Sequence, residues 1–195
     1  MNFVIGLTGP TGAGKSSAAD IARQLKIKVI DCDKIARKAV EKGSKGLSAL
    51  VAAFGEDILS CDGTLNREAL AERAFSSKEK TQLLNDTIFP FITELVKGEI
   101  DSPVVILDAP TLFESGIDGI CNTTIAVLAD LPSRKTRIME RDGIDEAHAT
   151  LRINAGNQDE FYIQNAKHII YNNSGISDFQ PKMHGLLVNI LGGIK

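Results

Sequence analysis

Short, nearly continuous apolar runs recur along the chain, separated by longer stretches with helical periodicity. Five of these runs have the length of buried strands, at residues 3–8, 27–31, 103–108, 123–128 and 168–171. Such runs are typical of strands that are covered on both faces. Because most of the intervening stretches are long enough for helical crossovers, we predict an α/β fold with a parallel sheet of about five strands.

The interval from about 35 to 100 is mostly helical in pattern and too long for a single crossover. Within it, Asn66 predicts a helix N-cap, and Pro90 predicts a helix boundary at Phe89. We interpret the interval as a helical insertion packed beside the sheet and not as a separate domain. Plain scaffold helices are the alternative interpretation.

Three further helices are predicted in the second half of the chain. Pro132 fits the first turn of a helix that runs through Met139, and Asp145 fits the N-cap of a helix through Ile153. The last helix is predicted over about 178–191.

The first apolar run leads directly into the segment G-P-T-G-A-G-K-S at residues 9–16, which matches the phosphate-binding motif G-x-x-x-x-G-K-[ST]. A predicted helix follows it, and strand, glycine loop and helix are the context that the motif requires. Loop N–H groups and a helix N-terminus then face one anion. Lys15 is suited to the terminal phosphates and Ser16 to Mg²⁺, so the segment predicts a nucleoside triphosphate site.

The composition is that of an ordinary globular protein. Apolar residues make up 43% and charged residues 24% of the 195, and the net charge is −3. We therefore expect no nucleic-acid-binding surface, and no apolar run approaches the roughly 20 residues of a membrane span. The three cysteines are scattered, which favours a reducing cytoplasm over a disulfide framework or structural zinc. No signal peptide is expected, and nothing predicts an oligomeric state.

Two aspartates, Asp31 and Asp33, stand where the second predicted strand ends. Ligands of an open parallel sheet bind outside the carboxyl ends of its strands. Phosphoryl transfer to a hydroxyl needs a group that orients the nucleophile and accepts its proton. Asp33 lies just past the strand and is the better candidate for this role. The structural alternative for either residue is the N-cap of the following helix.

Asp108 ends the third apolar run and is a candidate for contact with Mg²⁺ through water. The alternative is a turn residue before Pro110, and the pattern does not separate the two.

A run of basic residues falls in or just after the helix that Pro132 begins. Its members are Arg134, Lys135, Arg137 and Arg141, and Arg152 lies on the next helix. Such a run is usually solvated surface. The alternative is that some of these arginines neutralise charge on a transferring phosphoryl group, and Arg137 and Arg141, four residues apart, share a face.

In this order the motifs resemble the dephospho-coenzyme A kinases, a family of P-loop kinases, over nearly the whole chain. The resemblance is carried by residues 5–17, 29–37, 54–55, 62–70, 108–114, 137–142, 152–153 and 171–175. The loop motif alone is unspecific, whereas the ordered set of later motifs is much more specific. The chain differs from the usual family pattern at Phe89, Thr111 and Gly156.

The resemblance implies a three-layer P-loop kinase domain over residues 1–195. Its core would comprise 1–34, 101–131 and 166–195, with an acceptor-binding insertion at 35–100 and a helical lid at 132–165. It also implies that the chain uses ATP with Mg²⁺ to phosphorylate the ribose 3′-hydroxyl of dephospho-coenzyme A, which gives coenzyme A and ADP.

The resemblance further assigns roles to individual residues. The implied catalytic residues are Lys15, Asp33, Arg141 and Arg152. The implied ATP-binding residues are Gly9, Thr11, Gly12, Ala13, Gly14, Lys15, Ser16, Ser17, Arg137 and Asn173. The implied acceptor-binding residues are Asp33, Arg67, Phe89 and Asp108. Ser16 and Asp33 are the implied Mg²⁺ contacts, either directly or through water.

Two other functions compete with this one. The nearest is a P-loop kinase that acts on another small alcohol or nucleotide. The other is a nucleotide-binding switch module without an acceptor. The absence of an N-K-x-D guanine motif, together with Asp33 and the basic run, favours a kinase over a switch.

Overall fold

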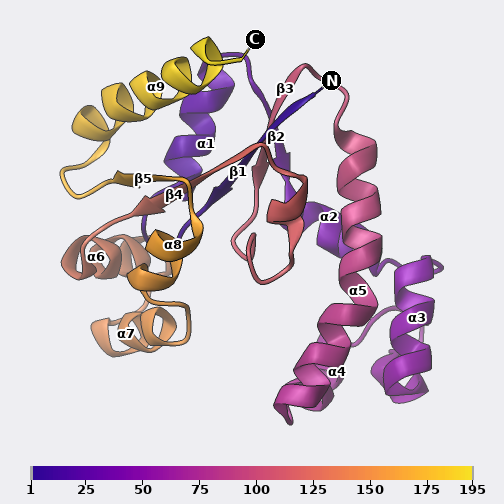
Figure 1. Cartoon of the computed structure of the whole chain (residues 1–195). Coiled ribbons are helices and arrows are strands. Elements are labelled where there is room, and N and C mark those ends of the chain that lie inside the picture. The colour runs from indigo at the N-terminus through magenta and orange to yellow at the C-terminus, as the bar shows by residue number, and fades with distance from the viewer. Residues whose placement is uncertain (1, 195) are drawn as a thin grey trace. The chain divides into compact units, whose positions relative to one another are not determined.

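The computed structural model describes residues 2–194, which form two compact units (Figure 1). The first comprises residues 2–30 and 102–194, and the second runs from Asp31 to Asp101. The second unit therefore begins and ends within a few residues of the predicted insertion at 35–100. The arrangement of one domain with a core and a lid stays a prediction.

The sheet has five strands in the order β2-β3-β1-β4-β5. The strands are β1 (Phe3–Thr8), β2 (Lys28–Asp31), β3 (Val104–Asp108), β4 (Thr123–Leu128) and β5 (His168–Tyr171). Strand β1 pairs in parallel with β3 and β4, and β4 pairs in parallel with β5. This confirms the predicted α/β fold, and each strand begins and ends within one residue of its prediction.

Alternate residues of the central strands pack against helices on opposite faces of the sheet. Helices α1 (Lys15–Gln24) and α9 (Ile176–Gly192) lie side by side on one face (Figure 1). Ile125 and Val127 of β4 belong to the buried cluster under these two helices. Ala126 and Leu128 point the other way, into a cluster with Tyr162 of α8 (Asp159–Asn165). Because side chains alternate along a strand, a continuous apolar run can fill both clusters.

The basic run lies on helices with the predicted N-terminal signals. Helix α6 (Leu131–Asp142) begins at the cap Asp130, with Pro132 in its first turn. Helix α7 (Glu146–Asn154) is capped by Asp145, which accepts a hydrogen bond from the His148 N–H at 2.8 Å. Both predicted starts are confirmed. A short 3₁₀ helix, η2 (Ile117–Ile120), precedes β4.

The second unit is helical and is built around one long helix, α5 (Lys78–Glu99). Helices α2 (Cys32–Ala39), α3 (Lys45–Phe54) and α4 (Arg67–Ala74) pack against it, and η1 (Glu56–Ile58) joins α3 to the segment before α4. Asn66 caps α4 by accepting a hydrogen bond from the Ala69 N–H at 3.1 Å, which confirms that prediction.

The predicted helix boundary at Phe89 is wrong, because α5 continues through Pro90. A proline inside a helix removes one backbone hydrogen bond and costs about 3 kcal/mol. Ile88, Ile92 and Val96 of this helix are buried, and full burial of such a side chain contributes about 1.5–3 kcal/mol. Tertiary packing on both sides of Pro90 therefore outweighs the local preference to end the helix.

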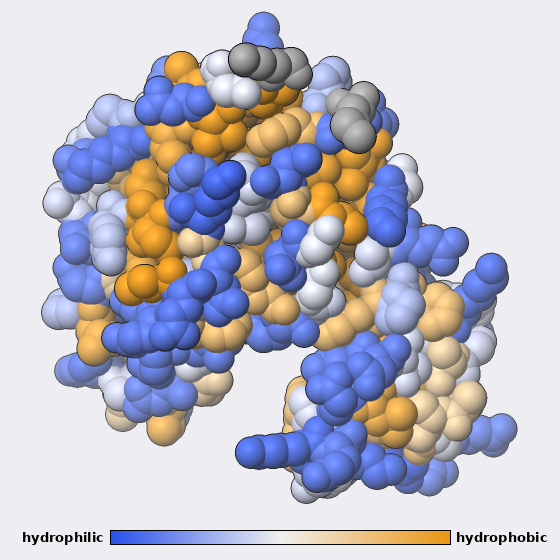
Figure 2. Space-filling view, viewed as in Figure 1, coloured by the Kyte–Doolittle hydropathy of each residue, from blue (hydrophilic) through white to orange (hydrophobic). Residues whose placement is uncertain are grey.

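Within residues 2–194, no helix combines the length and the apolar character that crossing a bilayer requires. On the face shown in Figure 2, hydrophobic residues are visible between hydrophilic ones.

Candidate functional site: a phosphate-binding loop held by two arginines and an asparagine

The loop between β1 and α1 has the geometry that the motif predicts. Gly9 has a φ of 147° and Gly14 a φ of 99°, in a region that other residues rarely adopt. A Cβ at Gly9 would lie 2.2 Å from the Val127 carbonyl oxygen, and one at Gly14 would lie 2.1 Å from Asn172 Nδ2. Glycine therefore lets the loop turn sharply and approach its neighbours closely.

The first turn of α1 is arranged to receive an anion. Gly14 is its N-cap, and the structure shows no side-chain cap bond there in the part of the chain it describes. The N–H groups of a helix start and its dipole together favour negative charge. The hydroxyl of Ser16 lies on an exposed residue of this turn. The arrangement suits a phosphate group.

Lys15, the lysine of the motif, forms an ion pair with Asp108 at the end of β3. Both side chains are mostly buried, at 18% and 16% exposed. Asp108 therefore holds the ammonium group beside the loop, and its neighbour Ala109 donates a hydrogen bond to the Leu7 carbonyl at 3.0 Å. The structure thus brings together two residues that the sequence placed 93 positions apart.

Arg137 and Asn172 hold the carbonyl groups of the loop. Arg137 donates to the carbonyls of Gly12 and Ala13, each at 3.2 Å, and to the carbonyl of Asn172 at 2.7 Å. The Asn172 side chain, on a residue 4% exposed, donates to the Ala13 carbonyl at 3.0 Å. Asn172 was not identified as a site residue from the sequence. Its position in the N-N-S-G turn was the one signal that could have identified it. Arg137 therefore contacts the backbone of the loop, and its role in ATP binding stays a prediction.

Asn173 lies next to this contact but makes a different one. Its side-chain oxygen accepts a hydrogen bond from the Asp130 N–H at 3.0 Å, and its carbonyl accepts one from Ser133 Oγ at 3.3 Å. It therefore ties the turn after β5 to the start of α6.

Solvated surface, the usual interpretation of a basic run, is wrong for Arg134. Its residue is 2% exposed, and its guanidinium donates to the Thr11 carbonyl at 3.0 Å and to Asp159 of α8 at 3.2 Å. Burial lowers the pKa of Arg134, and the charge of Asp159 opposes that shift. The helical pattern could not show this, because the loop and α8 lie far away along the chain.

Arg141 and Arg152 meet on one carboxylate. Arg141 donates to both oxygens of Asp142, at 2.8 and 2.9 Å, and Arg152 of α7 donates to the same side chain. Their side chains are 60% and 52% exposed. The hydrogen bond from Arg141 holds the pKa of Asp142 below its usual value. The two arginines predicted to be catalytic are thus held together at the junction of α6 and α7.

The two aspartates after β2 have different environments. Asp31 is the N-cap of α2 and accepts a hydrogen bond from the Lys34 N–H at 3.0 Å. The N-cap, which the sequence left open for either residue, therefore belongs to Asp31. Asp33 is an exposed residue of the first turn of α2. The other two predicted acceptor residues of this unit lie on different helices: Arg67 is exposed at the start of α4, and Phe89 is half-buried on α5.

Ser16 in the first unit and Asp33 in the second each carry an oxygen donor, the kind of ligand that Mg²⁺ prefers. Among residues 2–194 no three His, Cys, Asp or Glu side chains cluster as a metal site. The kinase family implies a divalent metal ion.

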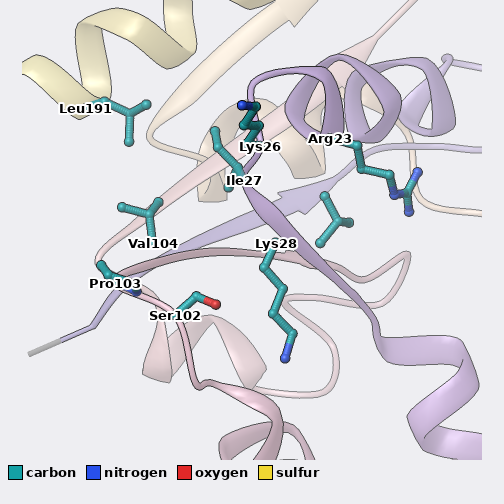
Figure 3. Close-up of a pocket in the computed structure, with 9 residues that line it drawn as sticks. Arg23, Lys26, Ile27, Lys28, Ser102, Pro103, Val104 and Leu191 are labelled. Carbon is teal, nitrogen blue, oxygen red and sulfur yellow. The ribbon is translucent and has the colours of Figure 1, made fainter.

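A cavity of about 650 Å³ lies elsewhere in the first unit, lined by residues that include Lys28 and Val104 at the amino ends of their strands. The loop at Gly9–Gly14 follows the carboxyl end of β1. Figure 3 shows the charged ends of Arg23 and Lys28 pointing in different directions, and Arg23 pairs with Asp20 at 2.6 Å. Three cationic residues, Arg23, Lys26 and Lys28, line the cavity, but it lies at the other end of the strands from the phosphate-binding loop.

A phosphate-binding loop at the carboxyl edge of a parallel sheet, with two arginines of α6 on its carbonyls, has the arrangement of a P-loop kinase fold, the class to which the chain belongs. The family model for dephospho-CoA kinase matches residues 3–178. The chain is 40% identical to the dephospho-CoA kinase of Pseudoalteromonas translucida, over 90% of this chain and 85% of that one. It is 37% identical to that of Corynebacterium efficiens, over 98% of both.

A solved structure shares the fold. The dephospho-CoA kinase from Campylobacter jejuni superposes with a TM-score of 0.70 and 24% identity, and the match covers 99% of each chain. The chain belongs to the dephospho-CoA kinase family, which confirms the resemblance seen in the sequence.

Proposed function

We propose that this chain transfers the terminal phosphoryl group of ATP to the ribose 3′-hydroxyl of dephospho-coenzyme A, in the cytoplasm, with the residues named below. As a member of its family, the chain is an ATP-dependent kinase of dephospho-CoA. The observation that carries the proposed mechanism is the loop at Gly9–Gly14, whose carbonyls are held by Arg134, Arg137 and Asn172.

ATP binds the loop through its phosphates. Gly9, Thr11, Gly12, Ala13 and Gly14 supply backbone around the polyanion, and Ser16 and Ser17 follow in the first turn of α1. Lys15, placed by Asp108, stabilises the developing charge on the transferred group. Arg137 supports the loop, and Asn173 fixes the adjoining turn.

Ser16 and Asp33, the latter directly or through water, would hold Mg²⁺. When bound, this ion neutralises phosphate charge and aligns the terminal phosphate for in-line attack.

Asp33 orients the acceptor hydroxyl and takes its proton. Because Asp31 caps α2, Asp33 is not required for that structural task. Arg67 and Phe89 of the second unit contribute to acceptor binding, together with Asp108. This arrangement gives the helical insertion a role in acceptor recognition.

Arg141 and Arg152 neutralise charge on the transferring group, and Asp142 keeps them together. Closure of the lid segment at 132–165 would exclude water, which prevents wasteful hydrolysis of ATP.

The mechanism is tested by comparing Asp33→Asn with Asp31→Asn, a matched control two residues away. Asparagine is as good an N-cap as aspartate, so Asp31→Asn should keep both the helix and kcat. Asp33→Asn should lower kcat by roughly 10²–10⁴ with little change in the KM for ATP. The assay follows dephospho-CoA gaining one phosphate by mass spectrometry.

Other small alcohols and nucleotides are offered in parallel. No turnover of dephospho-CoA alongside phosphorylation of another alcohol would identify the rival kinase. ATP hydrolysis that no acceptor accelerates would indicate a switch module. A wild-type kcat in Asp33→Asn would remove Asp33 from the mechanism.

A further inference from the structure

Burying Arg134 at its position has a large desolvation cost. A buried guanidinium loses its hydration, and recovers that loss only if its donors and its charge are well paired. Two donors are paired, on Thr11 and Asp159, but the buried Nη2 has no hydrogen-bond partner among the described residues. An apolar side chain of similar volume would fill the same space without this cost. Stability alone therefore does not explain an arginine here.

The hydrogen bond from Arg134 to the Thr11 carbonyl also fixes the direction of the next N–H group in the loop. In a planar trans peptide, the C=O of one residue and the N–H of the next point in opposite directions. Arg134 Nε holds the Thr11 carbonyl at 3.0 Å, so the N–H of Gly12 is aimed away from Arg134. Arg137 and Asn172 act in the same way on Ala13, whose carbonyl fixes the direction of the Gly14 N–H.

Asp159 in turn fixes Arg134. It is the first residue of α8, and its side chain is 35% exposed, so its outer edge remains in water. The chain of contacts therefore runs from α8 through Arg134 of α6 to the loop. These three segments are separated in sequence by 25 and 123 residues.

We propose that Arg134 is a positioning residue that holds the Thr11–Gly12 peptide so that the Gly12 N–H faces the nucleotide phosphates, and that Asp159 holds Arg134. The inference rests on the proposed function, because it takes the loop as the ATP site. It adds a residue that binds no substrate itself and a link from α8 to the loop.

Arg134→Met separates positioning from stability. It removes the donor and the buried charge together, and Asp159 keeps access to water. The melting temperature should stay near the wild-type value or rise, whereas the KM for ATP should rise about tenfold, as expected for a lost hydrogen bond from a charged donor. The KM for dephospho-CoA should stay within about twofold. Arg134→Lys should recover part of the ATP affinity, because it restores a charged donor.

Lys135→Met is the matched control. It makes the same change in charge on the same helix and breaks an ion pair, the 2.6 Å contact from Lys135 to Glu146 of α7. The structure shows no contact from this pair to the loop among the described residues. Both KM values should remain at the wild-type level.

Asp159→Asn tests the second contact and keeps the proposal falsifiable if Arg134→Met does not fold. It should raise the KM for ATP by less than Arg134→Met does. A KM for ATP within twofold of wild type in the folded variants would overturn the proposal, whatever their melting temperatures. Failure of the proposed function can be distinguished from failure of this inference by experiments on the wild-type chain. If the wild-type chain neither turns over ATP nor binds a non-hydrolysable ATP analogue, the proposed function fails before any variant is made.

Discussion

Gly9→Ala probes how tightly the loop approaches the neighbouring strand. The new Cβ would lie 2.2 Å from the Val127 carbonyl oxygen, which is backbone of β4, a strand held between β1 and β5. Forcing a group into such a space costs about 1–3 kcal/mol. The φ of 147° adds conformational strain of about 1–3 kcal/mol.

The sum, about 2–6 kcal/mol, is a large share of the roughly 5–15 kcal/mol that stabilises a typical protein. At roughly 2–4 °C per kcal/mol for a chain of this size, the melting temperature should fall by about 4–24 °C. Gly143→Ala is the control. Gly143 also has a positive φ, 64°, but a Cβ there would meet nothing within 4 Å. It should cost only the backbone strain, about 1–2 kcal/mol.

The assay is thermal unfolding of both variants, followed by circular dichroism, with ATP turnover measured on the folded fraction. Equal losses in the two variants would refute the reasoning, because the close approach to Val127 would then have relaxed without cost.

Three other predictions concern the end of α6 and the cysteines. Arg141→Ala should lower kcat by roughly 10²–10³, while the melting temperature should fall no more than it does in Asp142→Asn, because the side chain is 60% exposed and both variants lose the same bond; a much larger fall in melting temperature with normal kcat per folded molecule would make Arg141 structural. Asp142 has a lowered pKa because of its bond from Arg141. Its contribution to stability is therefore present above the unfolded pKa of about 3.9 and is lost as pH falls through the lower folded value. Asp142→Asn should lower the melting temperature relative to wild type at pH 6, and the difference should vanish in strong acid. Burial raises the pKa of Cys121 to about 12, so a thiol reagent at pH 8 should modify exposed Cys61 and spare Cys121; equal rates would contradict this.

Much of the fold could be predicted from the sequence because the sequence signals for strands and helix caps are local. The runs at 3–8 and 123–128 became β1 and β4 with the predicted bounds, since β-branched residues favour strands wherever both faces are buried. The caps Asn66 and Asp145 were also readable, because an N-cap bond spans only three residues.

The candidate site was readable only in part. The loop motif and the ordered later motifs led to the family. The phosphate-binding motif is recognisable because it is defined by the spacing of its glycines and by the lysine that follows them. The loop's support did not follow from the sequence. Asn172 reaches Ala13 across 159 residues, and no local pattern distinguishes it from its neighbour Asn173.

Local sequence thus determined the strands, the starts of α4, α6 and α7, and the phosphate-binding loop, since each depends on residues within a few positions of one another. Tertiary structure decided that α5 runs through Pro90, that Asn172 holds the Ala13 carbonyl, and that Arg134 is buried against the loop. These outcomes depend on which surfaces meet. The free energy of burying side chains in these contacts amounts to several kcal/mol. It exceeds the local conformational preferences, which are smaller and do not depend on residues far away along the chain.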